Sequence, residues 1–346
     1  MLIREPALWR DVPVRGEVLD ASTRGLTGIE SLRLIRGRPP MGRLTGVDFG
    51  GADEGTAEFS MPVSAWLEWS SAGVPGGVLA LPTDAALGCA LQSLLPAHTQ
   101  YTTAEMSMTY VRPARVGSVV TAHARSLYAG RTMGLSEAEV VDDHGRLVAH
   151  STSRMRIFGD RTTGAPSRGG TAAPPLAVVT STAQDDGPDP YLRPLEGGVD
   201  RAAVRGMSGI QVVQAQARGD LPLPPLHHLI GITPTEARDG AAACALPLSG
   251  WLATPFGWPQ GGFMVVLCDM ALALAVQTTL APGERMASVD IKVNFLRAVA
   301  GDGSFIEARA RVVHRGRSLA VSTAEVVAAD GKTVALATGS AALLGT

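Results

Sequence analysis

Cysteine is scarce in this sequence, and its scarcity excludes several classes of protein. Only three of the 346 residues are cysteines, Cys89, Cys244 and Cys268, and each lies in an apolar stretch. An odd number of cysteines without zinc-type spacing argues against a disulfide framework and against a structural metal site. We therefore expect free, buried thiols in a reducing compartment, and the sequence implies no metal or other cofactor.

An excess of charge and a long apolar run are missing as well. The 30 basic residues face 32 acidic ones, and no basic cluster marks a surface for nucleic acid. The N-terminus has no apolar segment of signal-peptide length. The most apolar stretch, Gly262 to Val276, carries Asp269 in its middle and is too short to cross a bilayer. These absences predict a cytoplasmic protein that binds neither nucleic acid nor membrane.

What the sequence does contain is an internal repeat. RGLTGIE, which begins at Arg24, recurs as RGMSGIQ beginning at Arg205, an offset of 181 residues. From Gly46 the offset is 185 and holds for nearly seventy residues, and it is 186 at Gly130. The 185 offset pairs Pro62 with Pro247, Trp66 with Trp251, Gly76 with Gly261, Asp84 with Asp269, and Arg112 with Arg297. One register through so many Gly, Trp and Asp matches indicates a duplication.

The duplication defines the domain organisation. Residues 1–160 are predicted to form the first domain and residues 189–346 the second. Residues 161–188 are rich in Gly, Pro, Ser, Thr and Ala and have little periodicity, which is the composition of a linker. A recognition tail is the other interpretation of this segment.

Both copies predict the same order of elements. Each begins with a capping box, Thr27 to Glu30 and Ser208 to Gln211, followed by a Pro-containing turn and a short strand. Gly-Gly then opens a long apolar helix, and alternating apolar residues predict strands joined by hairpin turns. The predicted ranges are turns at 39–40 and 222–225, strands at 56–61 and 241–246, helices at 76–95 and 261–280, and in the second copy strands at 289–295, 312–314, 320–327 and 333–341. The fold class is α+β, with a long central helix packed on an antiparallel sheet in each copy.

A spaced set of residues recurs with this helix in both copies. Asp follows the first Gly of Gly-Gly by eight residues, and a hydroxyl residue follows the Asp by nineteen, just before the strands TAEMSMTYVRPA and SVDIKVNFLRA. The set is Gly76, Asp84 and Thr103 in the first copy and Gly261, Asp269 and Ser288 in the second. Each copy thereby resembles the hotdog fold, and within it the phenylacetyl-CoA thioesterase group of the 4-hydroxybenzoyl-CoA thioesterase superfamily. The resemblance covers residues 24–158 and 205–344 and implies a double hotdog that acts on acyl-CoA.

Two positions depart from the pattern of that group. Its His before Gly-Gly is replaced by Pro75 and Gln260, and its Asn six residues before that His is replaced by Trp69 and Thr254. The missing side chains put the rate of any reaction in doubt, and they leave the fold prediction intact.

The Gly and Asp positions suit thioester hydrolysis. A first-turn amide, Gly76 or Gly261, has no acceptor within its own helix and lies at the positive helix end, so it can polarise a carbonyl. The three- and four-residue helical neighbours of Asp84 and Asp269 are apolar except for glycine, so neither carboxylate lies on a polar face. Two buried carboxylates at equivalent positions favour a functional role, as nucleophile or general base. The structural alternatives are a Gly-Gly turn into the helix and carboxylates that hold the copies together by hydrogen bonds.

Helix geometry predicts that the two copies share their sites. Eight residues of helix separate the first Gly from the Asp by roughly 12 Å, whereas a reacting carbonyl must lie about 3 Å from both of its partners. The helix of the other copy, running antiparallel, can supply the second group. The predicted sites are Gly76 with Asp269 and Ser288, and Gly261 with Asp84 and Thr103. Pro82, inside the first helix, is expected to disturb the placement of Asp84 and make the Asp269 site the more active one.

Other residues are assigned to the substrate or to the surface. Thr103 and Ser288 are predicted to orient a water or the carboxylate. Gly77, Gly262 and Gln260 are predicted to contact substrate, and Arg131 and Arg317, in hairpin turns, to contact CoA phosphates as relatives do, with solvated arginines as the alternative. We interpret His227 and His228 as surface residues. Aromatic residues make up only 5% of the chain, which argues weakly against an aromatic-stacking pocket.

The leading functional prediction is hydrolysis of an acyl-CoA thioester. The first alternative is a catalytically silent protein that binds acyl-CoA or another acyl ligand, because the His and Asn of the group are missing. A hydratase or dehydratase is disfavoured, because no His lies on or just before either central helix. A duplicated fold can pair its own two sheets, so we expect one chain, or a homodimer of tandem chains, in solution.

Overall fold

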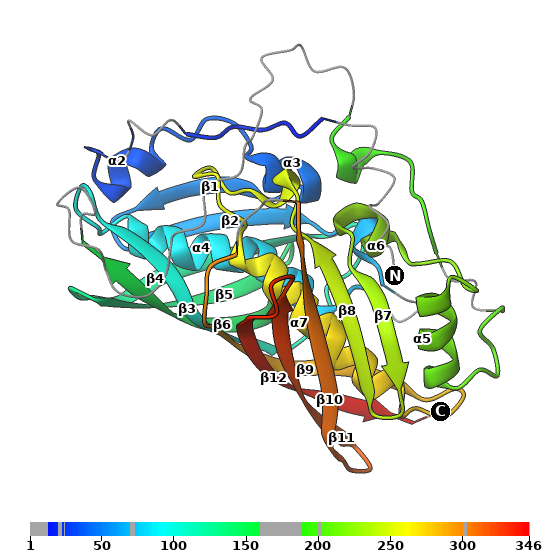
Figure 1. The fold of residues 1–346 in the computed structure, drawn as a ribbon. Helices are drawn as coiled ribbons and strands as arrows, with labels where there is room; N and C mark the ends of the chain where they lie inside the picture. The colour runs from blue at the N-terminus through cyan, green and yellow to red at the C-terminus, as the bar shows by residue number, and fades with distance from the viewer. Residues whose placement is uncertain are drawn as a thin grey trace.

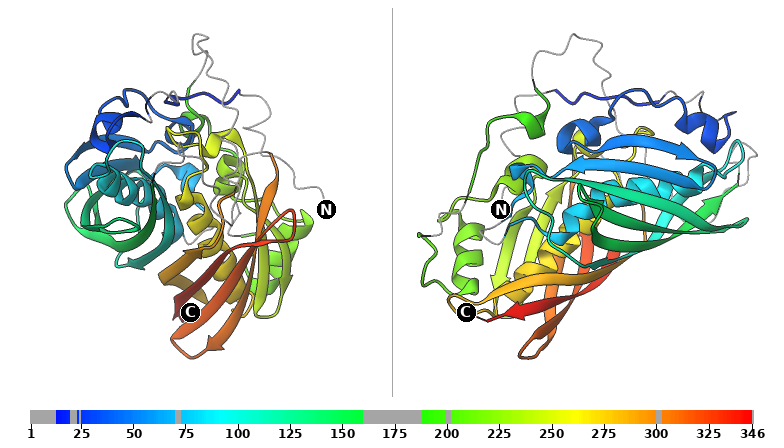
Figure 2. Two further views of the ribbon diagram at one scale, coloured as in Figure 1. Left: turned by 60° about the vertical axis from the view of Figure 1, so that its left-hand side comes forward. Right: turned by 180° about the vertical axis from the view of Figure 1, so that it is seen from behind.

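The strands of the protein form one continuous antiparallel sheet. The computed structural model describes residues 13–19, 23, 25–69, 73–159, 188–198, 202–299 and 303–345. Over these residues the sheet has twelve strands and wraps around two long central helices (Figures 1 and 2). The predicted α+β layout, with a long helix packed on an antiparallel sheet in each copy, is confirmed. Among the described helices none is both long and apolar enough to span a membrane.

The two copies contain the same elements in the same order. The first copy consists of α2 (Gly28–Leu32), α3 (Pro40–Thr45), β1 (Asp48–Asp53), β2 (Thr56–Pro62), a 3-10 turn (Gly76–Leu79) continued by α4 (Ala80–Gln92), β3 (Gln100–Tyr110), β4 (Val119–Ala129), β5 (Met133–Asp142) and β6 (Leu147–Phe158). The second consists of α5 (Gly209–Arg218), α6 (Pro225–Ile230), β7 (Thr233–Arg238), β8 (Ala241–Pro247), α7 (Gly261–Gln277), β9 (Arg285–Phe295), β10 (Phe305–Arg315), β11 (Leu319–Ala328) and β12 (Thr333–Leu344).

The copies join through one strand pair at the centre of the sheet. The strand order is β1-β2-β4-β5-β6-β3 in the first copy, and β9-β12-β11-β10-β8-β7 continues it in reverse. At the junction β3 and β9 run antiparallel, with Ser107 opposite Lys292. These two residues are also paired by the 185 offset of the repeat, so a pseudo-twofold axis passes between them. The axis brings α4 and α7 into contact inside the curved sheet.

The central helices differ in their first turn. α7 is α-helical from Gly261 onward, whereas the helix of the first copy begins as a 3-10 turn and becomes α-helical only at Ala80. Pro82 accounts for the difference, because it has no N–H to donate to the carbonyl four residues earlier. Both helices are buried almost all round, and residues of both copies form one hydrophobic core.

The capping boxes predicted at Thr27 and Ser208 are present. The first glycine of each short helix packs on the end of a central helix. Gly28 N–H donates to Leu95 O at 2.9 Å, and Gly209 N–H donates to Leu280 O at 3.0 Å. A Cβ added at Gly28 would lie 1.6 Å from Gln92 O, and one added at Gly209 would lie 1.8 Å from Gln277 O. Only glycine permits this approach.

Gly28→Ala is therefore expected to destabilise the protein by about 1–3 kcal/mol or more, because α2 must move away from α4. The measurement is the urea midpoint at unchanged slope. Gly25→Ala is the matched control, since a Cβ there would meet only His98 Cε1, at 3.9 Å. Equal midpoints for the two variants would contradict the packing argument.

Three sequence expectations need correction. The Pro-containing segments are not plain turns: Pro40 and Pro225 are the first residues of α3 and α6, where the missing N–H of proline costs nothing. His227 is buried within α6, with Nδ1 3.0 Å from Ile232 O, and burial lowers its pKa to about 4. The predicted alternation from Val289 breaks at a bulge, described below. The predicted linker, 161–188, lies outside the described residues except for Pro188.

Candidate functional site

Each central helix presents its aspartate to the first turn of the other helix. Asp269 Oδ2, on α7, accepts a hydrogen bond of 2.9 Å from the amide of Gly77. Asp84 Oδ2, on α4, accepts one of 3.0 Å from the amide of Gly262. The structure thus brings each Asp of one copy to the Gly-Gly of the other, on both sides of the pseudo-twofold axis. The two distances are alike, so the disturbance of Asp84 expected from Pro82 is not seen in this contact.

The aspartates replace the capping residues that both helices lack. Pro75 and Gln260 occupy the N-cap positions, and neither side chain caps its own helix. First-turn amides without an acceptor are costly when buried. Asp84 and Asp269 supply the acceptors from the opposite copy, which explains how two carboxylates are tolerated in a core.

The two glycines of each pair have different surroundings. Gly77 and Gly262 are buried and donate to the aspartates, whereas Gly76 and Gly261 are partly exposed. Cβ atoms at Gly77 and Gly262 would collide with Asp269 Cβ at 2.6 Å and Ala80 O at 2.7 Å. The second glycine therefore holds the carboxylate, with the Gly261 amide also contributing at Asp84, and the first glycine is the more exposed one of each pair.

The hydroxyl residues predicted beside the aspartates lie at β-bulges. Thr103 Oγ1 donates to Asp84 Oδ1 at 3.3 Å, and the Ser288 hydroxyl donates to Asp269. The pairing of β3 with β6 shifts between Thr103 and Glu105, and the pairing of β9 with β12 shifts at the equivalent place. A bulge changes which side chain faces the helix. The strict alternation of apolar and polar residues predicted from the sequence therefore does not hold at Val289.

Burial raises the pKa of both carboxyl groups. Asp84 is 8% exposed and Asp269 is 2% exposed, and desolvation raises the pKa of each from 3.8 to about 6. The Gly262 amide, the Thr103 hydroxyl and the Gly261 amide lower the pKa of Asp84 in part. The Gly77 amide and the Ser288 hydroxyl do the same for Asp269. At neutral pH both groups are mostly ionised and more basic than a solvated aspartate, which suits proton abstraction.

Gln260 bridges the two copies beside Asp84. Its Nε2 donates to Leu81 O at 2.6 Å, and it is 5% exposed. Because Leu81 O can only accept, the orientation of the side-chain amide is fixed. Gln260 Oε1 is buried and has no hydrogen-bond partner among the described residues. One hydrogen of the Gln260 side-chain amide is thus used in a hydrogen bond within the protein.

Two tyrosines beside the Gly and Asp positions were not predicted from the sequence. The ring of Tyr110, at the end of β3, packs on Gly76, where a Cβ would lie 2.8 Å from it. Tyr101, at the start of β3, packs on Gly88, and burial raises its pKa, with a smaller contribution from the charge of Asp84. The repeat offset held a usable signal, because it pairs Tyr110 with Phe295 and Tyr101 with Met286. The copies therefore differ where they flank the aspartates.

The structure does not bring Arg131 and Arg317 to the aspartates. Both are exposed in hairpin turns, between β4 and β5 and between β10 and β11. The first hairpin lies by the C-terminal end of α4, where Gly134 packs on Leu91. The second lies by the C-terminal end of α7, where Arg315 donates to Thr279. Each Asp–Gly pair involves the opposite, N-terminal end of a central helix.

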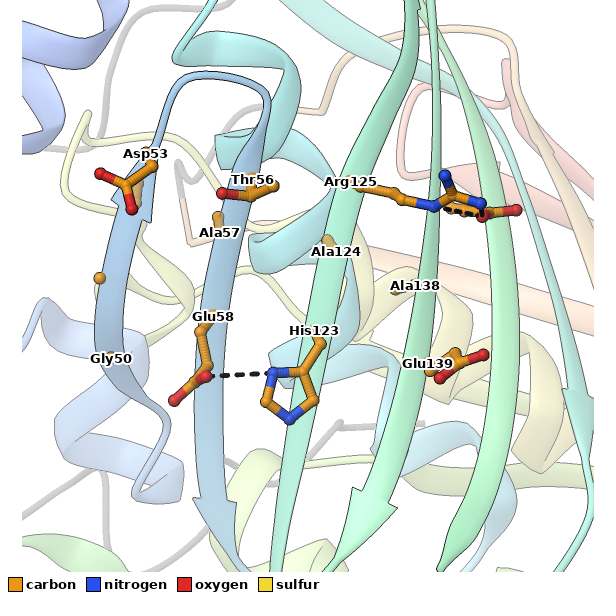
Figure 3. Close-up of a pocket in the computed structure, with 13 residues that line it drawn as sticks. Gly50, Asp53, Thr56, Ala57, Glu58, His123, Ala124, Arg125, Ala138 and Glu139 are labelled. Atoms are coloured by element: carbon orange, nitrogen blue, oxygen red, sulfur yellow. Dashed lines mark hydrogen bonds and ion pairs between the residues drawn. The ribbon is translucent and has the colours of Figure 1, made fainter. Parts of the chain in front are cut away.

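A hollow of about 610 Å³ lies elsewhere, on β1, β2, β4 and β5 (Figure 3). His123 Nδ1 lies 3.0 Å from Glu58 Oε2 within it, and Arg125 pairs with Glu137. In both contacts the polar side chains pair with each other at the surface. The hollow contains neither aspartate and is not a candidate for the site.

Comparison with known proteins assigns the class. The thioesterase superfamily model matches the chain twice, at residues 74–149 and 260–335. Each match begins just before a Gly-Gly pair and contains the Asp and the hydroxyl residue. The two copies of the repeat are therefore each similar to the thioesterase superfamily, and the two matches lie in tandem along the chain.

Three known proteins are similar to this chain in sequence or in structure. A 1,4-dihydroxy-2-naphthoyl-CoA hydrolase of Listeria monocytogenes is 28% identical over 96 residues, which are 28% of this chain and 76% of that protein. A conserved hot dog fold protein from Alicyclobacillus acidocaldarius matches with a TM-score of 0.54 and 17% identity, over 88% of this chain and 98% of its own. An acyl-CoA thioesterase II from Mycobacterium marinum matches with a TM-score of 0.50 and 11% identity, over 88% of this chain and 97% of its own. The fold is a double hotdog.

Proposed function

We propose that the protein hydrolyses acyl-CoA thioesters at two sites shared between its copies. One site combines the Gly76 amide with Asp269 and Ser288, and the other combines Gly261 with Asp84 and Thr103. The observation that carries the proposal is the reciprocal contact of the two aspartates. In each site the buried carboxylate, whose pKa is raised, accepts a hydrogen bond from the second glycine of a Gly-Gly pair. The first glycine of that pair is partly exposed.

The reaction follows from these positions. The thioester carbonyl oxygen accepts a hydrogen bond from the Gly76 amide, which stabilises the oxyanion that develops. Asp269 takes a proton from a water whose oxygen bonds to the carbonyl carbon. The carbon–sulfur bond then breaks, and CoA leaves as a thiolate that becomes protonated. Direct attack by Asp269 is the other route. It gives an acyl-aspartyl anhydride, which water then hydrolyses.

The two routes differ in where solvent oxygen goes. Single-turnover hydrolysis in water labelled with oxygen-18 places label in the Asp269 carboxyl group only if the carboxylate attacks and water cleaves the anhydride at that carboxyl. The hydrogen bonds from Gly77 and Ser288 favour general-base catalysis, because they occupy the carboxylate oxygens on the protein side.

The relatives support the substrate class. The Listeria protein is named for a CoA thioester, and the Mycobacterium protein for acyl-CoA. We expect the purified protein to release CoA thiol from at least one short, medium or aryl acyl-CoA, without added metal or nucleotide. A thiol-reactive dye measures the release across a panel, and the Asp84→Asn, Asp269→Asn double variant is the background control. Saturable binding without release above that control would replace hydrolysis with the silent binding function.

A further inference from the structure

The two shared sites carry different unpartnered polar atoms. Tyr110 Oη, beside Gly76, is buried and has no hydrogen-bond partner among the described residues, and Gln260 Oε1, beside Gly262, is in the same situation. A buried hydroxyl without a partner costs free energy, and it calls for an explanation such as a bound ligand. The atoms also differ in character, because a phenol can donate a hydrogen bond and an amide oxygen can only accept one.

The position of Tyr110 indicates which ligand atom it meets. A Cβ on Gly76 would lie 2.9 Å from Tyr110 Cζ, the carbon that carries the hydroxyl. The hydroxyl is one bond from this carbon and therefore lies close to Gly76. Asp269 Oδ2 accepts a hydrogen bond of 2.9 Å from the amide of Gly77, the next residue, so the carboxylate also lies close to Gly76.

The hydroxyl stays protonated at any working pH. Burial raises the pKa of Tyr110 well above its usual value, and the charges of Asp269 and Asp290 raise it further. Asp290 itself interacts with the Ser340 hydroxyl. Tyr110 is thus a neutral donor near an anionic carboxylate, and an oxyanion is the species that gains most from such a donor.

The other site lacks this group. The repeat places Phe295 where the first copy has Tyr110. A Cβ at Gly261 would meet the carboxylate of Asp84 first, with Oδ2 at 3.2 Å. Beside Gly262 the unpartnered atom is the acceptor Gln260 Oε1, which would repel a carbonyl oxygen and suits a substrate donor such as N–H or O–H.

We propose that Tyr110 Oη is a second hydrogen-bond donor to the thioester carbonyl in the Asp269 site, and that this site consequently turns over faster than the Asp84 site. The proposal rests on the proposed hydrolysis. It gives the inequality of the sites a different cause from the one expected at Pro82, since both aspartates reach their amides equally well.

The test isolates one site at a time. In an Asp84→Asn background only the Asp269 site works, and Tyr110→Phe removes a single oxygen atom from it. We expect kcat to fall about tenfold to a hundredfold, less than for loss of a main oxyanion donor because the Gly76 amide remains. KM should rise by a smaller factor, because the hydrogen bond already forms with the carbonyl of the bound substrate and becomes stronger in the transition state. The exposed Tyr128→Phe is the matched control.

The thermal midpoint of the variant distinguishes a role of the Tyr110 hydroxyl in turnover from a role in folding. Because Tyr110 Oη has no partner in the described structure, Tyr110→Phe should keep or raise the thermal midpoint. A lowered midpoint together with an unchanged kcat would assign the hydroxyl to folding. The reciprocal change, Phe295→Tyr in an Asp269→Asn background, should increase the kcat of the Asp84 site.

A binding measurement tests the contact between Tyr110 Oη and the substrate carbonyl even if no turnover is observed. An acyl-CoA analogue with a methylene between sulfur and carbonyl should bind the Asp84→Asn protein more tightly than the Asp84→Asn, Tyr110→Phe protein. If the wild type hydrolyses thioesters and Tyr110→Phe changes neither kcat nor analogue affinity, this inference fails and the proposed function stands. If no thioester is hydrolysed, the proposed function fails, and equal analogue affinities would overturn the inference as well.

Discussion

Replacing both aspartates by asparagine, Asp84→Asn with Asp269→Asn, is expected to lower kcat by about 10²- to 10⁴-fold, the contribution typical of a positioned general base. Affinity for acyl-CoA should stay within a few-fold, because the Gly76 and Gly261 amides are untouched. Singly, Asp269→Asn should lose most of the turnover and Asp84→Asn less. Initial rates of thiol release, with affinity from calorimetry, measure both quantities.

Asparagine is the informative replacement because the aspartates also link the copies. An asparagine at position 269 can still accept from the Gly77 amide through its oxygen, while its nitrogen donates to Ser288. The structural explanation of these carboxylates therefore predicts a folded and fully active variant. A variant that folds, binds and retains full turnover would eliminate the catalytic role.

Combining changes shows which residues share a site. A Cβ at Gly76 would press on Tyr110, so Gly76→Ala should damage the site proposed for Asp269. Gly76→Ala added to Asp269→Asn should then cost little more, whereas added to Asp84→Asn it should remove most of the remaining turnover. The opposite pattern would place Gly76 with Asp84 and refute the shared-site arrangement.

The sequence predicted the duplication because glycine, tryptophan and aspartate are costly to place by chance in one register. It also placed Asp84 and Asp269 on apolar helix faces, and the rise of a helix was enough to require the opposite copy. That reasoning depends only on chain geometry, which a sequence contains.

The unpredicted features depend on tertiary contacts. The amides bound by the aspartates belong to Gly77 and Gly262, because the exact approach of α4 to α7 decides which first-turn amide is covered. A bulge at Val289 leaves no trace in alternation, since it inserts one residue without changing composition. Tyr110 could be noticed only by comparing the copies where they differ, with its buried hydroxyl visible in the structure alone.

Lowering the pH should reduce turnover. It should also remove the destabilisation that the buried, ionised carboxylates cause. With the pKa of both carboxyl groups raised to about 6, lowering the pH from 8 to 4 protonates the proposed bases. We expect kcat/KM to fall about tenfold per unit below pH 6, roughly a hundredfold at pH 4. A profile that is flat down to pH 4 would exclude these groups as bases.

Stability should change in the opposite direction to activity. A carboxyl group whose pKa rises from 3.8 unfolded to about 6 folded stabilises the native state fully below pH 3.8, and this contribution is lost as the pH rises through 6. About two pKa units correspond to roughly 3 kcal/mol of lost stability per group above pH 6. Asp269→Asn removes the charge and keeps the hydrogen bonds. It should therefore be more stable than the wild type at pH 8, by up to about 3 kcal/mol.

Denaturant unfolding of wild type and Asp269→Asn at pH 8 and pH 4 tests this sign, because the difference between them should nearly vanish at pH 4. Asp142→Asn is the opposite control. Hydrogen bonds from Arg146 lower the pKa of Asp142 to about 2, so its contribution is present above pH 4 and is lost as the pH falls through 2. That variant should be less stable than the wild type at pH 8. If Asp269→Asn were also less stable at pH 8, the buried carboxylate would be a net stabiliser of the contact between the copies, and its retention would need no catalytic explanation.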